Sequence, residues 1–214
     1  MDDLTANIEK LQANLPGHVL LVGVTKTVPP EIVDQALTAG ITTFGENKIQ
    51  EAKAKIPVVS SRARWHFIGH LQTNKAREAV ALFDLIHSVD SVKLAGELNK
   101  CAAAAGKTQR ILLEVNVAGE ASKFGLKPED VPGALETINQ LPRLQVEGLM
   151  TVAPFTGDAR PHFRRLRELR DQLGLRELSM GMSHDYLPAI EEGATIVRIG
   201  SAIFGARKKY EPTE

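Results

Sequence analysis

The sequence predicts an α/β fold, a single (β/α)8 barrel of the TIM type that occupies residues 1–214. The chain has 214 residues, of which 43% are hydrophobic, and this suits one domain with a full core. Eight short apolar runs alternate with helical patterns, as in a closed parallel sheet. No Gly-x-Gly-x-x-Gly turn follows the first run, which disfavours the alternative, an open doubly wound sheet.

The expected strands are apolar runs whose C-terminal ends carry polar residues or glycine. In order, they are placed at Val19–Thr25, Thr42–Gly45, Trp65–Ile68, Leu82–His87, Arg110–Asn116, Leu144–Met150, Glu177–Met180 and Thr195–Ile199. The strands of such a barrel are parallel, so their C-terminal ends share one rim, where barrel proteins place their chemistry.

The expected helices are marked by capping residues. They cover residues 2–14, Pro30–Ala39, Lys48–Ala54, Asn74–Leu82, Ser91–Ala105, Pro128–Gln140, Ala159–Leu173 and Tyr186–Glu192. Pro30 suits a first-turn position, where the missing N–H is harmless. Ser91 offers an N-cap. Gly40, Gly106 and Gly193 follow helices at positions that suit a left-handed C-cap.

Composition excludes several classes of protein. Acidic and basic residues balance at 26 each, which argues against a nucleic-acid binder. No apolar stretch reaches the roughly 18 residues of a membrane span, and the acidic N-terminus lacks the apolar segment of a signal peptide. The single cysteine, Cys101, suits a reducing compartment. We therefore expect a cytoplasmic protein without a membrane partner.

Lys26 is the most informative residue. It follows the apolar run Val19–Thr25, so it lies at the C-terminal end of the first strand. A partly desolvated lysine loses preference for its charged form and, once neutral, forms a Schiff base with a carbonyl compound. The alternative is a lysine that ends a strand and points to water.

The last two strand ends predict a phosphate site. Ile199–Gly205 is typical of a strand end, a glycine turn and a short helix, whose Gly200 and Ser201 offer N–H groups and a hydroxyl. Met182 and Ser183 follow the preceding strand, and barrels often bind phosphate between these two loops. Arg198 either faces this site or pairs with a neighbouring strand. The alternative is two ordinary glycine turns.

The six histidines show no metal-ligand spacing, so a zinc site is not expected. His66 and His87 therefore carry no predicted role, and Trp65 and Phe67 are expected in the core. The basic run Arg164–Arg170 is interpreted as a solvated helix face.

Several motifs together resemble a known family, the pyridoxal phosphate homeostasis proteins. They are Val24–Thr27, Phe44–Asn47, Trp65–Gly69, Leu71–Lys75, Ile86–Asp90, Ser122–Gly125, Gly148–Met150, Ser179–Ser183 and Val197–Gly205, in order along nearly the whole chain. These proteins are similar to the barrel domain of alanine racemase, without its C-terminal β-domain. His70 replaces a proline of some relatives, and His184 lies in a variable loop.

The resemblance implies a cofactor, pyridoxal 5′-phosphate, and a set of residues that bind it. Lys26 would form the Schiff base, Arg198 would lie near the pyridine ring, and Asn47 would line the pocket. Lys123 matches a second lysine of the family that handles the cofactor in transit. The full predicted set is Lys26, Asn47, Lys123, Met182, Ser183, Arg198, Gly200 and Ser201. An arginine beside the pyridine nitrogen keeps it unprotonated, which weakens the ring as an electron sink.

Three functions compete. The first is a non-catalytic carrier that holds pyridoxal phosphate and delivers it to apo-enzymes that depend on this cofactor. The second is an amino-acid racemase, but Tyr186 and Tyr210 lie in no recognisable second-base motif. The third is a barrel that binds another phosphorylated metabolite. The absent second domain favours a monomer.

Overall fold

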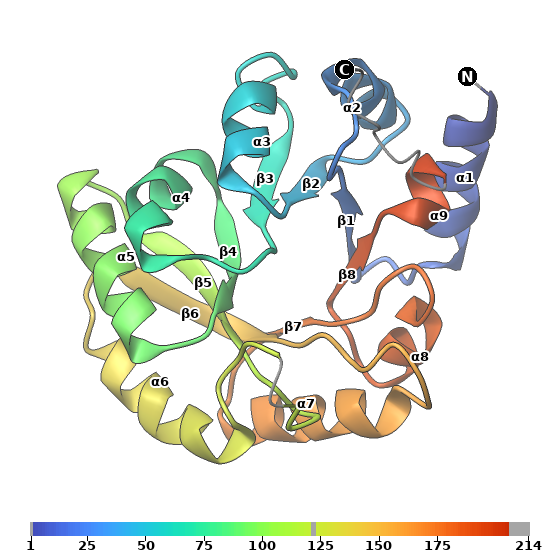
Figure 1. Cartoon of the computed structure of the whole chain (residues 1–214). Coiled ribbons are helices and arrows are strands. Elements are labelled where there is room, and N and C mark those ends of the chain that lie inside the picture. Colours follow the sequence, from blue (N-terminus) through green and yellow to red (C-terminus); the bar gives the residue numbers. More distant parts are fainter. Residues whose placement is uncertain (1, 121–122, 206–214) are drawn as a thin grey trace, which may run out of the picture.

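The computed structural model describes residues 2–120 and 123–205, and they form a closed barrel of parallel strands (Figure 1). The strand order follows the chain order: β1 (Leu20–Val24), β2 (Thr43–Glu46), β3 (Arg64–Phe67), β4 (Leu85–Val89), β5 (Gln109–Glu114), β6 (Leu144–Met150), β7 (Glu177–Ser179) and β8 (Ile196–Ile199). The predicted barrel is therefore confirmed, and every strand ends at the same rim.

Helices surround the barrel on its outer side (Figure 1). They are α1 (Asp2–Asn14), α2 (Pro30–Thr38), α3 (Ile49–Lys55), α4 (Ala76–Leu82), α5 (Val92–Ala104), α6 (Val131–Asn139), α7 (Arg160–Gln172), α8 (Tyr186–Glu191) and α9 (Ser201–Phe204), with short 3₁₀ turns η1 (Thr73–Lys75) and η2 (Pro128–Asp130). Ser91 Oγ accepts a hydrogen bond from Leu94 N, which confirms the predicted N-cap of α5.

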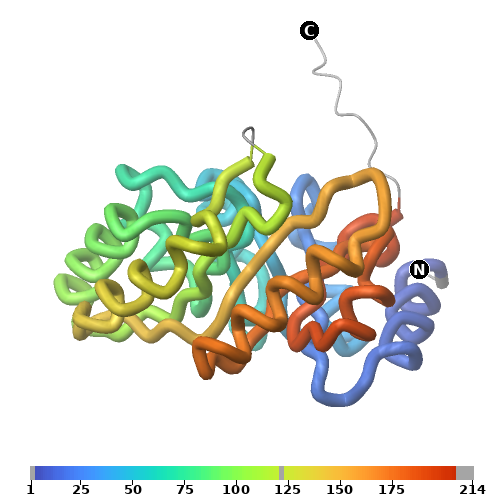
Figure 2. Tube along the Cα trace, turned by 90° about the horizontal axis from the view of Figure 1, so that it is seen from below, coloured from blue at the N-terminus to red at the C-terminus, as the bar shows by residue number. Residues whose placement is uncertain are grey.

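Closure of the barrel places the first and last strands side by side. Val22 on β1 is in register with Thr43 on β2 and with Arg198 on β8. Outside the sheet, α1 packs beside α9, where Asn7 Nδ2 donates to the carbonyl oxygen of Ile203 at 3.2 Å. Figure 2 shows the same neighbours from a second direction. The loops after β7, β8 and β1 thus belong to one part of the rim.

The core has two layers. The larger one lies between strands and helices and includes Phe44, Phe67 and Phe83. The smaller one fills the inside of the barrel with Val22, Leu85, Leu112, Met150 and Ile196. Because side chains alternate along a strand, these inward residues identify which other positions face the barrel interior.

Several predicted boundaries differ from the structure, including two near the start of β4. The fourth strand begins at Leu85 rather than Leu82, because residues 76–82 form α4. The predicted helix Asn74–Leu82 begins as the 3₁₀ turn η1. Positive φ angles at Gly40, Gly106 and Gly193 confirm the predicted left-handed caps.

Ser122 and Tyr210 lie outside the described residues. Within the described part of the chain, no helix combines the length and apolar composition needed to cross a membrane.

Candidate functional site

Lys26 lies directly beyond β1 and is half-buried at the barrel rim. The backbone around it is held in place, because Thr25 N donates to Gly45 O on β2 at 3.1 Å. The next residue, Thr27, has a φ of 62°. A positive φ is strained for a β-branched residue and is found mainly where the surroundings enforce it, often at functional sites.

A buried ion pair lies beside the backbone that carries Lys26. Lys55 Nζ contacts Glu46 Oε1 at 2.5 Å and donates to Thr25 O at 2.6 Å. Thr25 Oγ1 also donates to Glu46 Oε1, at 2.6 Å. Burial raises the pKa of Glu46, although the hydrogen bonds from Lys55 and Thr25 act in the opposite direction. This pair connects the end of β1 to β2 and α3.

Asn47 follows β2 next to this segment, since Val24 and Gly45 are in register. Its Oδ1 is buried and has no hydrogen-bond partner among the described residues. The backbone of Asn47 lies so close to Gly69 that a Cβ on Gly69 would come within 2.2 Å of Asn47 O. Position 69 therefore requires glycine, and Asn47 offers an unused acceptor.

The turns after β7 and β8 are joined through Ser183. Its Oγ accepts hydrogen bonds from Gly200 N at 3.3 Å and from Ala202 N at 3.4 Å. Met182 N donates to Asp185 Oδ1 at 2.6 Å, which orders the turn that carries Ser183. The structure thus brings together Met182, Ser183, Gly200 and Ser201 at one point of the rim.

Arg198 lies at the base of these turns and is only 4% exposed. Its Nη1 donates to Ser179 Oγ at 2.6 Å and its Nη2 donates to Thr151 O at 2.9 Å. Burial lowers the pKa of Arg198 to about 10, against the opposing charges of Glu114 and Asp185. Of the two alternatives for Arg198, the contacts show the pairing with neighbouring strands, and its role at a ligand site stays a prediction.

Two histidines, for which no role was predicted, extend this network. Ser179 Oγ is 2.8 Å from His87 Nδ1, and His87 Nε2 is 3.0 Å from His66 Nδ1. Burial lowers the pKa of His66 to about 3 and that of His87 far below its ordinary value. Both imidazoles are neutral at pH 7, so the chain from Arg198 to His66 consists of hydrogen bonds to neutral rings.

Lys123 lies on a different part of the rim, in the loop after β5. Its Nζ is 3.0 Å from Glu120 Oε1 and 3.4 Å from Ala153 O. Across the described residues, no hydrogen bond or ion pair connects Lys123 to Lys26, Ser183 or Arg198. Lys123 instead lines a cavity of about 240 Å³ with Glu114 and Asn116.

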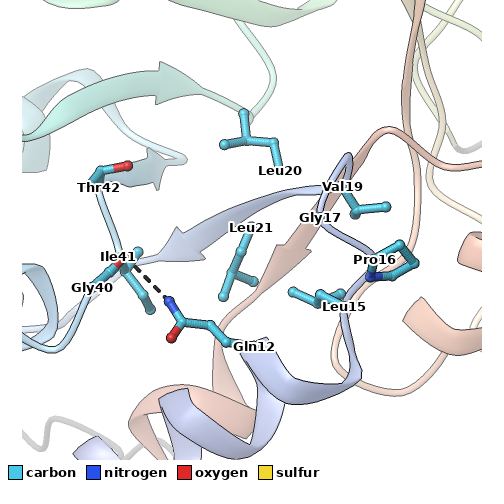
Figure 3. A pocket seen from close by; sticks show the side chains of 10 residues that line it. All are labelled: Gln12, Leu15, Pro16, Gly17, Val19, Leu20, Leu21, Gly40, Ile41 and Thr42. Atoms are coloured by element: carbon cyan, nitrogen blue, oxygen red, sulfur yellow. Dashed lines mark hydrogen bonds between the residues drawn. The ribbon is translucent and has the colours of Figure 1, made fainter.

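A second cavity, of about 230 Å³, opens at the other end of the barrel. It lies where β1 begins, between α1 and the segment before β2 (Figure 3). Gln12 Nε2 donates to Gly40 O at 3.3 Å across it. None of the predicted site residues lines this cavity.

The residues that the sequence interpretation left without a role are Glu46, Lys55, His66, His87, Glu114 and Ser179. For three of these residues, the sequence pattern contains a feature that could have identified them. His66, His87 and Ser179 each stand at an inward position near the end of a strand, where an apolar residue would be expected. Among the described residues, no three His, Cys, Asp or Glu side chains are arranged to hold a metal ion.

Comparison with known sequences identifies the family. A family profile described as the N-terminal domain of alanine racemase matches residues 1–208. The chain is 47% identical over 198 residues to the pyridoxal phosphate homeostasis protein of Aquifex aeolicus, covering 88% of this chain and 87% of that protein. It is 44% identical over 228 residues to the protein of the same name in Pseudomonas aeruginosa, with 99% of both chains covered.

Solved structures agree with this assignment. PipY of Synechococcus elongatus with pyridoxal phosphate bound superposes with a TM-score of 0.87 and 36% identity, covering 94% of this chain and all of that one. An alanine racemase of Clostridium difficile shares the fold, with a TM-score of 0.81, 14% identity, and coverage of 98% of this chain and 58% of the racemase. With its barrel, its predicted motifs and its full-length relatives in agreement, this chain belongs to the pyridoxal phosphate homeostasis protein family.

Proposed function

We propose that this protein binds pyridoxal 5′-phosphate at the C-terminal rim of its barrel and holds it for delivery, without robust catalysis. The observation that carries the proposal is the joining of Ser183 to the backbone of Gly200 and Ala202, beside buried Arg198. The strand that carries Arg198 pairs with the strand that precedes Lys26. PipY, a relative with pyridoxal phosphate bound, supports the same assignment.

The donors at the turns after β7 and β8 fit a phosphate. Ser183 Oγ accepts two backbone N–H groups, so its own O–H remains available as a donor. Ser201 adds an exposed hydroxyl at the start of α9. These two hydroxyl donors complement an anion, and barrels often bind phosphate at this position.

The other side of the site fits an aldehyde cofactor. Pyridoxal phosphate supplies an aldehyde that condenses with a lysine amine with loss of water, and half-buried Lys26 is the lysine beside these turns. Thr25 and Thr27, on either side of it, are held by Glu46, Lys55 and Glu51, which limits the positions open to the amine. Asn47 Oδ1 is a buried acceptor, and a donor group of a bound molecule would supply the hydrogen bond that it lacks among the described residues.

Arg198 favours holding the cofactor over chemistry on it. Its guanidinium remains charged at neutral pH, because its pKa is about 10. A pyridine nitrogen beside this charge stays unprotonated, and an unprotonated ring stabilises a carbanion poorly. A racemase would also need a second base. Tyr186 packs against the hydrophobic core, and Tyr210 lies outside the described residues.

The decisive experiment is borohydride reduction of the full chain loaded with pyridoxal phosphate, followed by peptide mass spectrometry. We expect one reduced adduct, on Lys26, and a visible absorbance band that Lys26→Ala abolishes. Lys48→Ala is the matched control, because Lys48 is an exposed lysine beside Asn47, and it should retain both signals. An adduct on another lysine would contradict the proposal. Rapid deuterium exchange at the α-carbon of alanine would favour the racemase.

Delivery has its own test. The loaded protein is mixed with an apo-enzyme that requires pyridoxal phosphate, in the presence of a phosphatase that removes free cofactor. Under these conditions, the loaded protein should activate the apo-enzyme faster than the same amount of free cofactor does. If Lys26→Ala mixed with the cofactor activated the apo-enzyme equally fast, the cofactor anchored on Lys26 would not be the form delivered.

A further inference from the structure

The cavity at Lys123 lies across the barrel mouth from Lys26. It opens over the ends of β5 and β6, and β5 stands opposite β1 in the closed strand order. Its lining residues are Glu114, Val115, Asn116, Lys123, Phe124 and Val152. Its volume of about 240 Å³ is below the roughly 300–1,000 Å³ of pockets for drug-sized molecules, so it suits a molecule of few heavy atoms.

Two hydrogen-bond acceptors of this cavity have no partner among the described residues. Asn116 Nδ2 donates to Glu120 O at 2.8 Å and to Lys123 O at 3.3 Å, which fixes the orientation of the amide. Asn116 Oδ1 is then left buried and without a partner in the described part of the chain. An unsatisfied buried acceptor costs about 1–3 kcal/mol, so a bound donor at this position would be stabilising.

Glu114 is the second acceptor. Leu112 faces the barrel interior, so Glu114, two residues further along β5, faces the same way. Within residues 2–120 and 123–205, its carboxyl group makes no hydrogen bond or ion pair. The carboxyl group therefore reaches the cavity with its oxygens available to a ligand.

The opposite charge comes from Lys123, whose Nζ is held by Glu120 and by Ala153 O. Phe124 and Val152 provide apolar walls, and the Phe124 ring stacks on His70 with ring centroids 3.5 Å apart. The cavity thus combines two acceptors, one cation and an apolar surface. A single carboxylate and one amide are too few ligands for a calcium or magnesium ion.

From this combination we infer that the cavity binds a small zwitterion of the α-amino-acid type. The ammonium group lies on Glu114 and Asn116 Oδ1, and the carboxylate lies on Lys123. A phosphate is disfavoured here, because the Glu114 carboxylate and the Asn116 carbonyl oxygen would both face its oxygens. The inference goes beyond the proposed function, since it requires no cofactor at Lys26.

The charge state of Glu114 makes the binding dependent on pH. Burial and the nearby carboxylate of Asp90 raise the pKa of Glu114 to about 7, whereas Arg198 on β8 acts in the opposite direction. Lys123 is the other charged group that lines the cavity. Only the ionised carboxyl group pairs with an ammonium, so affinity should rise with pH up to about 7 and level off above it.

The test is a calorimetric titration of the full chain with L-alanine at about pH 8, compared with propionate and ethylamine. Each analogue lacks one charged group of the zwitterion and should bind at least about tenfold more weakly. Glu114→Gln should weaken alanine binding about tenfold and remove its pH dependence. Glu129→Gln, which removes an exposed carboxylate on η2, should change neither.

Two further variants distinguish alanine binding in this cavity from reaction of alanine at Lys26 and from misfolding of Glu114→Gln. Lys26→Ala should bind alanine as the unaltered protein does, so binding that disappears with Lys26 would point to reaction at the cofactor. Lys123→Met should bind alanine and ethylamine equally well, which provides a second route if Glu114→Gln does not fold. Equal binding of propionate, displacement of alanine by inorganic phosphate, or no saturable binding up to about 50 mM would overturn the inference.

Discussion

The guanidinium of Arg198 and the hydroxyl of Ser179 are joined by a hydrogen bond of 2.6 Å inside the barrel, where both groups are buried. The same hydroxyl is 2.8 Å from His87 Nδ1. Because the arginine can only donate, Ser179 Oγ accepts from Arg198, and the same oxygen is hydrogen-bonded to His87 Nδ1. One serine therefore links the position of Arg198 to that of His87.

Replacing Ser179 by alanine should lower the free energy of unfolding by about 2–3 kcal/mol, because a buried guanidinium N–H and a histidine nitrogen both lose their partner. Urea denaturation measures the effect. Ser88→Ala is the matched control, since Ser88 Oγ is buried without a partner in the described structure. Its removal should be neutral or slightly stabilising, and equal losses in the two variants would refute this account.

The two buried histidines should make stability depend on pH. The pKa of His66 is about 3 in the folded protein, below its ordinary value near 6.5 in the unfolded chain. Between these values the unfolded state binds a proton that the folded state does not. Stability is therefore present above pH 6.5 and falls with decreasing pH by about 1.4 kcal/mol per unit for such a group.

Urea denaturation at several pH values between about 7.5 and 4.5 checks this prediction. His66→Gln should flatten the dependence, whereas His18→Gln, at an exposed position before β1, should leave it unchanged. A slope that survives in His66→Gln and in His87→Gln would assign the pH dependence to other groups.

The Glu46–Lys55 pair gives a third prediction. Lys55→Met leaves the buried carboxyl group of Glu46 without its cation and should cost about 3–5 kcal/mol in unfolding free energy. Lys53→Met removes an exposed cation that pairs with Glu78 and should cost less than about 1 kcal/mol. Similar costs in both variants would show that the buried pair adds nothing beyond a surface pair. Because Lys55 also holds Thr25 O, cofactor retention on Lys26 should weaken in Lys55→Met.

Gly181 gives a fourth prediction, about the turn that carries Ser183. Its φ is 92°, and a Cβ there would lie 2.6 Å from Ala189 Cβ and 3.0 Å from Tyr186 Cα. Gly181→Ala should therefore destabilise the protein by roughly 2–4 kcal/mol through strain and overpacking, and it should displace Ser183 from Gly200.

Gly96→Ala is the comparison, because Gly96 lies inside α5 with no atom within 4 Å of an added Cβ. This change should stabilise the protein by about 0.5–1 kcal/mol. Both variants are read by chemical denaturation and by loading with pyridoxal phosphate. Full cofactor binding by Gly181→Ala would show that this turn does not contribute to the cofactor site.

Local features of the sequence were enough to predict most of the fold. Apolar runs with polar ends gave the correct number and order of strands, and the caps at Ser91, Gly40 and Gly193 were correct, because capping depends on residues a few positions apart. The start of β4 was missed because Leu82 continues the apolar face of α4, and apolar residues alone do not separate a helix end from a strand.

The sequence by itself determined the barrel and the place of Lys26 at the end of β1, since alternation and turn chemistry are local properties. Only the tertiary structure decided that Arg198 contacts Ser179, that His87 and His66 continue this network, and that Glu114 shares a cavity with Lys123 rather than with Lys26. These contacts join strands that are far apart in the chain. They depend on how the barrel closes and on the register shifts at β4–β5 and β5–β6, which no short stretch of sequence specifies.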